Sequence, residues 1–395
     1  MKQQFYPKKR LYSFISILLV FTVLCCMIPS PALASSSPYT DALQKANSLK
    51  QIIISDVPDC TWTENTVCAN TFPLYDIDLN VNGYVFEFET NGSPSGFIQI
   101  DLSTGEARLD SYCFSGVHTS NIMKQGKKNL SSNAKTIYLG GYSYLTEQPS
   151  APFSLTKSYM DLYTGETLSL DTQVKAEIRE SYNQYVANKA STKRSFASLQ
   201  PKGLNTVTKY VSGYRSVGWE TYSSVGDSTG LTCGPIAVTN ICKYWDLCKG
   251  KTRLYTAGST YQELKKTMAA FGSSSSAFKN NVYKWRDYVS SKGYTPSIHT
   301  FDKKAEWDIS FATYKEFIDW NRPFLYHALW PTSHAVAAFG YQYIEVENTI
   351  IVADAVSSTC VYRTWSSLGH GKGEWDPDGF FGSQSVQQCS CVVPL

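Results

Sequence analysis

The chain has 395 residues, a formal net charge of +3, 17% charged residues and 14% aromatic residues. This balance excludes a highly charged disordered chain, and no basic patch of the nucleic-acid-binding kind occurs outside the first ten residues. The length exceeds that of one typical compact core, so two domains are the first expectation.

Residues 1–34 have the pattern of an export signal. An apolar stretch covers residues 11–28, and Ala-Leu-Ala at residues 32–34 is a small-x-small cleavage site. The alternative is an uncleaved membrane anchor, because the stretch is near the lower length for spanning a bilayer. Cleavage would leave about 360 residues with a charge of about −1 and no second segment of spanning length. The basic residues before the apolar stretch are Lys2, Lys8, Lys9 and Arg10.

The leader therefore predicts a secreted protein that is extracellular or associated with the cell surface. We expect no membrane contact after signal cleavage and no nucleic-acid partner. No Cys-x-x-Cys or His-x-x-x-His spacing occurs, so no metal site is predicted, and no cofactor is expected either.

Residues 35–186 are expected to form a β-rich N-terminal domain with helical flanks. Strands are predicted where apolar residues alternate, and helices where they recur at helical spacing. The predicted helices cover residues 41–55 and 171–190, and the predicted strands cover residues 84–88 and 97–100, joined by a hairpin-type loop at 91–96.

A short sequence, Asp-Leu-x-Thr-Gly-Glu, occurs at residues 101–106 and again at 161–166. It predicts two similar turns, and a duplicated strand–turn–strand unit is the alternative. The polar stretch at residues 187–204 predicts a linker, and Lys193-Arg194 within it would suit a processing protease. We therefore treat residues 35 to about 200 as a candidate propeptide that covers a cleft until export is complete.

Residues 205–395 are expected to form a second domain in which helices precede an antiparallel sheet. This order is typical of an α+β fold. The predicted helices are residues 233–247, 260–271, 277–291 and 307–320, and the predicted strands are residues 324–330, 334–343 and 349–356.

Cys233 stands where a thiol becomes a nucleophile. Gly234 and Pro235 follow it and open an apolar run, and proline suits a first helical turn because its missing N–H needs no partner there. The positive end of a helix favours a thiolate, which is the reactive form. A buried structural cysteine is the alternative. His334 and Asp354 lie on two later predicted strands, so the three residues can supply a nucleophile, a base and an orienting group.

Three segments resemble the secreted relatives of the bacteriocin-processing cysteine peptidases, which have a papain-like fold. They are residues 232–235 (Thr-Cys-Gly-Pro), 333–336 (Ser-His-Ala-Val) and 351–354 (Ile-Val-Ala-Asp). The resemblance covers residues 205 to about 375, and the β-rich region before it resembles the pro-region of streptopain-type peptidases.

The resemblance implies a secreted cysteine endopeptidase that hydrolyses a peptide or protein substrate and is made as a zymogen, with its own N-terminal domain as inhibitor. Cys233 would attack the amide carbonyl, His334 would move the proton, and Asp354 would accept a hydrogen bond from the second ring nitrogen. The backbone N–H of Cys233 and one side-chain donor would hold the oxyanion.

The sequence departs from the family at that side-chain donor. The family has a glutamine about six residues before the cysteine, and this chain has Asp227. Either Thr232, Ser228 or Thr229 donates instead, or Asp227 is protonated, or activity is weak or absent. The oxyanion candidates are therefore Asp227 and Thr232.

Two other functions remain open. A transglutaminase-like or amidase fold also has Cys, His and Asp in this order, and a non-catalytic cell-surface binding protein could use an inactive peptidase scaffold. Nine cysteines follow the leader, an odd number that fits bridges plus one free thiol. The bridges considered are Cys60–Cys68 and pairs among Cys360, Cys389 and Cys391. His327 is expected to be a packed strand residue.

Overall fold

The structure is a computed structural model that describes most of the chain after residue 36. The expected leader at residues 1–34 and the last part of the expected linker, from residue 197, lie outside the described residues. Grouped by their contacts, Ala42–Leu395 form one compact unit and Met1–Asp41 another. The described residues are 37–116, 135–148, 157–163, 167–170, 172–196, 206–227, 232–268, 275–301, 310–328, 334–345, 347–368 and 387–395.

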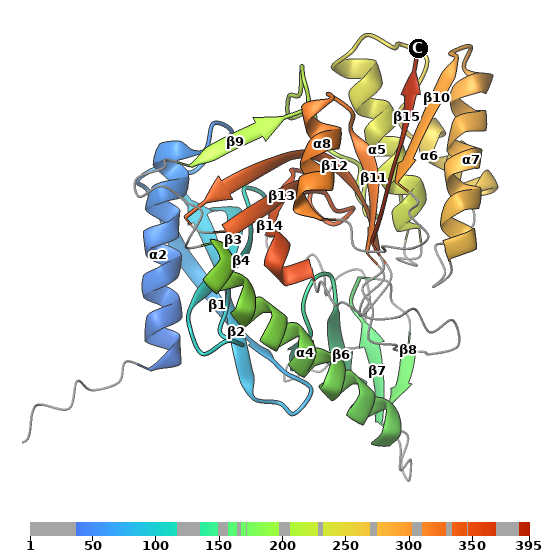
Figure 1. Cartoon of the computed structure of the whole chain (residues 1–395). Coiled ribbons are helices and arrows are strands. Elements are labelled where there is room, and N and C mark those ends of the chain that lie inside the picture. Colours follow the sequence, from blue (N-terminus) through green and yellow to red (C-terminus); the bar gives the residue numbers. More distant parts are fainter. Residues whose placement is uncertain are drawn as a thin grey trace, which may run out of the picture. The chain divides into compact units, whose positions relative to one another are not determined.

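The described residues form a mixed α/β structure with six α-helices, one short 3-10 helix and fifteen strands (Figure 1). None of these helices is long and apolar enough to cross a membrane. The helices are α2 (Pro38–Asp56), α4 (Thr172–Phe196), α5 (Cys233–Leu247), α6 (Ser259–Thr267), α7 (Ser275–Ser291), α8 (Phe311–Asp319) and η1 (Trp365–Leu368). The strands before the expected linker are β1 (Thr66–Tyr75), β2 (Val81–Thr90), β3 (Ser93–Asp101), β4 (Arg108–Cys113), β5 (Thr136–Tyr138), β6 (Tyr144–Glu147), β7 (Lys157–Asp161) and β8 (Thr167–Leu170). Those after it are β9 (Val207–Tyr210), β10 (Pro296–Phe301), β11 (Phe324–Ala328), β12 (His334–Ile344), β13 (Glu347–Ala353), β14 (Val361–Thr364) and β15 (Gln387–Pro394).

One mostly antiparallel sheet includes all the described strands. Its order is β10-β15-β11-β12-β13-β14-β4-β3-β2-β1-β5-β6-β7-β8, and β9 pairs with β12. The β1–β5 pairing is parallel. Strand β14 pairs with β4, where Tyr362 lies opposite Tyr112. The two regions separated by the expected linker therefore share one sheet, as Figure 1 shows where β14 meets β4.

The coarse expectation of helices combined with an antiparallel sheet is confirmed. Helix α4 continues through residues 187–196, the first part of the expected linker. The hairpin between β2 and β3 is tighter than predicted, because β3 begins at Ser93 and only Asn91 and Gly92 form the turn. Both have positive φ, 53° and 76°, and Asn-Gly is the pair that best tolerates this conformation.

The repeated Asp-Leu-x-Thr-Gly-Glu segments begin with the same local structure. The Asp101 carboxylate accepts the backbone N–H of Ser103 (3.2 Å), and the Asp161 carboxylate accepts that of Tyr163 (2.8 Å). Both aspartates end a strand, and an antiparallel strand returns after each turn. The expectation of two similar turns is confirmed for the described part of each segment, since an aspartate that binds its own backbone two residues on favours a turn.

All nine cysteines in the described residues are free thiols, so the bridges considered between Cys60 and Cys68 and within the C-terminal group are absent. Each thiol of the first pair contacts a backbone carbonyl two residues ahead, that of Trp62 for Cys60 and that of Asn70 for Cys68. Cys242 on α5 is fully buried.

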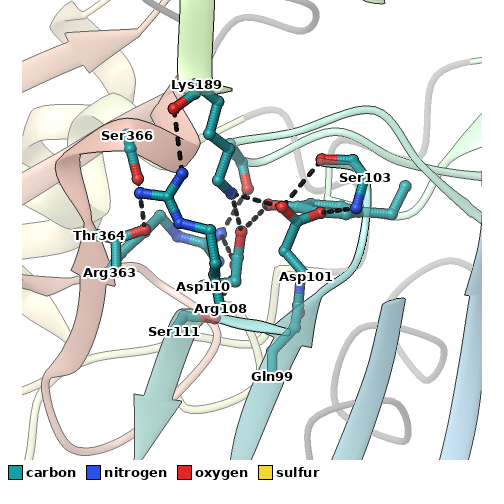
Figure 2. A network of polar contacts seen from close by, with 12 residues as sticks. Gln99, Asp101, Ser103, Arg108, Asp110, Ser111, Lys189, Arg363, Thr364 and Ser366 are labelled. Carbon is teal, nitrogen blue, oxygen red and sulfur yellow. Dashed lines mark hydrogen bonds and ion pairs between the residues drawn. The ribbon is translucent and has the colours of Figure 1, made fainter. Parts of the chain in front are cut away.

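A buried network of charged side chains joins the strands that precede the expected linker to those that follow it (Figure 2). Arg363 on β14 donates to the Asp110 carboxylate on β4 (3.2 Å) and to the carbonyl of Gly141 (2.6 Å). The Nζ atom of Lys189 on α4 lies 2.9 Å from a carboxylate oxygen of Asp101 and 3.9 Å from one of Asp110. Burial raises the pKa of Asp110, although the charges of Arg363 and Lys189 act to lower it. These charges are removed from water, so their mutual pairing is what makes their burial tolerable.

A second buried pair continues this network. Arg108 on β4 donates to the carboxylate of Glu347 on β13 (2.6 Å) and to the carbonyl of Lys189 (3.0 Å), and Ser366 donates to Glu347 (3.1 Å). Two ion pairs between side chains on opposite sides of the expected linker therefore have almost no access to solvent. Removing one partner of either pair would leave a buried charge uncompensated.

Arg363→Met should lower the free energy of unfolding by about 3–5 kcal/mol, the usual cost of breaking a buried ion pair. Urea unfolding of the full chain measures it. The matched control is Arg179→Met, because Arg179 and Asp78 form an exposed pair that should contribute nothing measurable. Equal small losses in both variants would show that the buried network does not hold the two parts of the sheet together.

Candidate active site

Cys233 is the first residue of α5, and it is 3% exposed. Pro235 lies in the first turn, as the sequence predicted, and the helix continues with residues that are buried on almost every side. Helix α5 packs against β12 because Ile236, Val238 and Ile241 are fully apolar and fully buried. This packing fixes the thiol at the helix start beside the strand that carries His334.

The surroundings of the thiol suppress its ionisation in this structure. Burial raises the pKa of Cys233 to about 11, while the backbone N–H groups of Ala335 and Gly234 and the hydroxyl of Tyr222 act in the opposite direction. Donors around the sulfur favour a thiolate, as expected at a helix start, but exclusion of water outweighs them.

His334 begins β12 and is held by Asp354. Its Nε2 lies 3.1 Å from the backbone carbonyl oxygen of Asp354. A carbonyl only accepts, so Nε2 carries the proton and Nδ1 is the basic nitrogen. Within the described residues Nδ1 has no hydrogen-bond partner. This is the tautomer that can take a proton from a thiol through Nδ1.

Asp354 contacts His334 through its backbone carbonyl oxygen, whereas the sequence predicted this contact for its carboxylate. Its carboxylate accepts the backbone N–H groups of Val356 (3.0 Å) and Ser357 (2.9 Å), and Tyr163 donates to it at 3.5 Å. The carboxylate therefore stabilises its own turn, in which Ala355 has a φ of 66°. Burial raises the pKa of Asp354, and the two backbone N–H groups act to lower it.

Two tyrosines from the N-terminal region cover the His334 ring. The ring centre of Tyr142 lies 4.7 Å from that of His334, and the ring centre of Tyr163 lies 4.9 Å from it. Burial lowers the pKa of His334 to about 3, and the Arg363 charge acts in the same direction. Arg363 also lies over the Tyr142 ring, 4.7 Å from its centre. The buried charge network therefore extends to the cover of the histidine.

The thiol and the imidazole are both neutral at neutral pH in this arrangement. In the part of the chain that the structure describes, no hydrogen bond joins Cys233 to His334. A thiol whose pKa is about 11 and an imidazole whose pKa is about 3 do not form a thiolate–imidazolium pair near pH 7. The candidate triad is gathered in one region but is held in an uncharged state.

The two oxyanion candidates bind each other. Thr232 donates its hydroxyl hydrogen to the Asp227 carboxylate, and Tyr261 donates to the same oxygen at 3.1 Å. Lys265 lies 3.9 Å from the other oxygen. The Asp227 carboxylate therefore accepts hydrogen bonds and donates none. The hydroxyl hydrogen of Thr232 is already used in its bond to this carboxylate. Ser228 and Thr229 lie outside the described residues.

Of the other histidines considered, His327 is fully buried on β11, opposite Ala335, which confirms it as a packed strand residue. Burial lowers its pKa to about 3, with a smaller effect of His334. Within the described ranges, no group of three or more His, Cys, Asp or Glu side chains is arranged to hold a metal ion.

Sequence reasoning did not identify Tyr142, Tyr163 or Tyr222. The chain has 27 tyrosines, and none of these three has a local pattern that separates it from a core residue. One signal was available for Tyr163, because it lies in the second repeated segment, between β7 and the antiparallel strand β8.

The chain matches no protein-family model and no curated protein. A function for it therefore depends on the geometry of the site and on the sequence motifs.

In the full chain, alkylation of Cys233 by iodoacetamide should rise about tenfold per pH unit between about pH 6 and pH 9, because only the thiolate reacts. No plateau is expected in that interval, since burial raises the pKa of Cys233 to about 11. Mass spectrometry of the peptide that contains Cys233 follows the reaction, with the buried Cys242 of the same helix as internal reference. A rate that is already constant below pH 7 would contradict the neutral pair.

Proposed function

We propose that the chain is a secreted cysteine endopeptidase with a papain-like catalytic region, in which Cys233 is the nucleophile, His334 the general base and Asp354 the residue that orients the histidine. The observation that carries the proposal is the Nε2 contact with the Asp354 carbonyl, which leaves Nδ1 as the basic nitrogen. The next residue along β12, Ala335, contacts the thiol with its backbone N–H. The proposed base, His334, therefore lies next in sequence to a residue that contacts the proposed nucleophile, on a strand that packs against α5.

The proposed reaction has two halves. In the first, the Cys233 sulfur attacks the amide carbonyl carbon, its proton passes to Nδ1 of His334, and the C–N bond breaks as that proton moves to the leaving amine. In the second, water attacks the thioester with His334 as base, the C–S bond breaks, and the thiol recovers its proton. The backbone N–H of Cys233 at the helix start would stabilise the oxyanion in both halves.

The N-terminal region acts as the inhibitor of the same chain in this proposal. Its support is the contact of Tyr142 and Tyr163 with the His334 ring, which excludes water and keeps the imidazole neutral. Residues 35 to about 200 would thus be a propeptide, and the leader at residues 1–34 would export the zymogen. Activation requires that the two tyrosines leave the histidine, after which a peptide or protein substrate can reach the thiol.

A binding protein built on an inactive peptidase scaffold is the second candidate. The observation in its favour is Asp227, which stands where the resembling family has a donor and is itself bound as an acceptor. A transglutaminase-like or amidase activity would use the same three residues, and transfer of the acyl group to an added primary amine would identify it.

A peptidyl epoxide should label Cys233 in the wild-type protein after the incubation that gives its highest peptidase activity. Cys233→Ser should lose labelling and hydrolysis completely, and His334→Ala should slow both by about a hundredfold or more, because the base is lost. Mass spectrometry of the labelled peptide and a casein assay measure the two effects. If wild-type protein neither reacts nor hydrolyses under any activating condition, the peptidase proposal fails and the scaffold interpretation is favoured.

Replacing Tyr142 and Tyr163 together by alanine should speed labelling of Cys233 in the unprocessed full chain by about tenfold or more, because the closed state loses two buried rings. The matched control replaces both by phenylalanine, which keeps the rings over His334 and should label at the wild-type rate. Equal rates in all three proteins would argue against inhibition by these tyrosines.

A further inference from the structure

The site as described so far lacks a side-chain donor for an oxyanion. Asp227 accepts hydrogen bonds from Thr232 and Tyr261, and the single hydroxyl hydrogen of Thr232 points to that carboxylate. The negative charge that forms when a carbonyl is attacked needs a donor whose hydrogen is not already used. Neither candidate from the sequence meets this condition.

The backbone of Tyr222 is fixed beside the turn that follows Asp354. Its N–H donates to the carbonyl of Ala355 (2.9 Å), the residue after Asp354, and its carbonyl accepts the N–H of Asp227 (2.9 Å). The N–H of Trp219 adds a bond to the carbonyl of Ser358 (2.8 Å). The segment that precedes α5 is therefore tied to the turn that follows β13, and Tyr222 has little freedom to move away.

The side chain of Tyr222 ends beside the Cys233 thiol, where it acts to lower the pKa of that thiol. The residue is 0% exposed, and among the described residues its hydroxyl has no partner that meets hydrogen-bond geometry. A fully buried hydroxyl without a partner is costly, so its presence beside the thiol calls for an explanation, and a catalytic role is one. Its hydrogen remains available for an acceptor that arrives at the sulfur.

Tyr222 also keeps its proton. Burial raises its pKa well above the ordinary value, and the negative charges that Cys233, Asp227, Asp354 and Asp161 would carry add to this effect. The phenol is therefore a donor throughout the pH range in which a cysteine peptidase could work.

We propose that the Tyr222 hydroxyl is the side-chain donor of the oxyanion hole, in the role that the resembling family gives to a glutamine. It donates its hydrogen to the carbonyl oxygen as negative charge develops there, and it neither forms nor breaks a covalent bond. The backbone N–H of Cys233 is the second donor. This inference rests on the proposed peptidase function and gives a catalytic role to a residue eleven positions before the nucleophile.

The test compares two reactions of the same thiol in Tyr222→Phe, made as the full chain and activated in the same way as the wild type. Peptide hydrolysis passes through an oxyanion, whereas alkylation by iodoacetamide does not. We expect kcat to fall by about 10²–10³-fold, with alkylation of Cys233 within about threefold of wild type. A peptide aldehyde, whose adduct carries the same oxygen, should bind more weakly by a similar factor.

The matched control is Tyr244→Phe, which removes a buried hydroxyl from α5 that donates to the Ser212 carbonyl, away from the thiol. Its kcat should remain at the wild-type value, and thermal unfolding of both variants checks that they fold. Undiminished hydrolysis by Tyr222→Phe would overturn the inference while leaving the peptidase function intact. Equal losses in hydrolysis and alkylation would also overturn it, because the effect of the tyrosine on the reactivity of the thiol would then account for the whole loss. Wild-type protein without either reaction would refute the peptidase function and this role together.

Discussion

The packing of Tyr142 and Tyr163 on the His334 ring is the contact on which the state of the site depends. It removes the imidazole from water, and because burying an ion costs free energy, the neutral form is favoured over the charged form. A neutral imidazole cannot stabilise a thiolate on Cys233, and burial alone then raises the pKa of the thiol. The proposed catalytic groups lie in one region, and their exclusion from water keeps them uncharged. A displacement that admits water would reverse this.

The cover is held in place by charges that are themselves buried. Arg363 contacts the Tyr142 ring, and its guanidinium is paired with Asp110 on the neighbouring strand. Two strands from opposite sides of the expected linker thus share both backbone pairing and an ion pair at the same place. Cutting the chain after α4 would leave these contacts intact, so release of the N-terminal region has to break buried pairs as well as a peptide bond. In the proposed zymogen, these buried pairs would therefore help to maintain the uncharged state before activation.

Much of the site could be predicted from sequence, because local chemistry determines it. Pro235 and the apolar run after Cys233 specify a buried helix that begins at the thiol, and the alternating residues around His334 specify a strand. The pairing of β4 with β14 could not be predicted, since it joins segments more than 240 residues apart without a local signal. The role of the Asp354 carbonyl was equally hidden, because its carboxylate was the more obvious acceptor. Tyr222 was missed because only the folded turn brings its hydroxyl to the sulfur.

The charge on His334 before and after activation tests the central claim most directly. Nitrogen-15 NMR of the ring reports whether Nδ1 carries a proton. In the intact chain at about pH 6 we expect the neutral form with hydrogen on Nε2, because burial lowers the pKa of His334 to about 3. In protein that has gained activity we expect both nitrogens to be protonated beside a thiolate. A ring that is already charged in the intact chain, or one that stays neutral in fully active protein, would contradict the account.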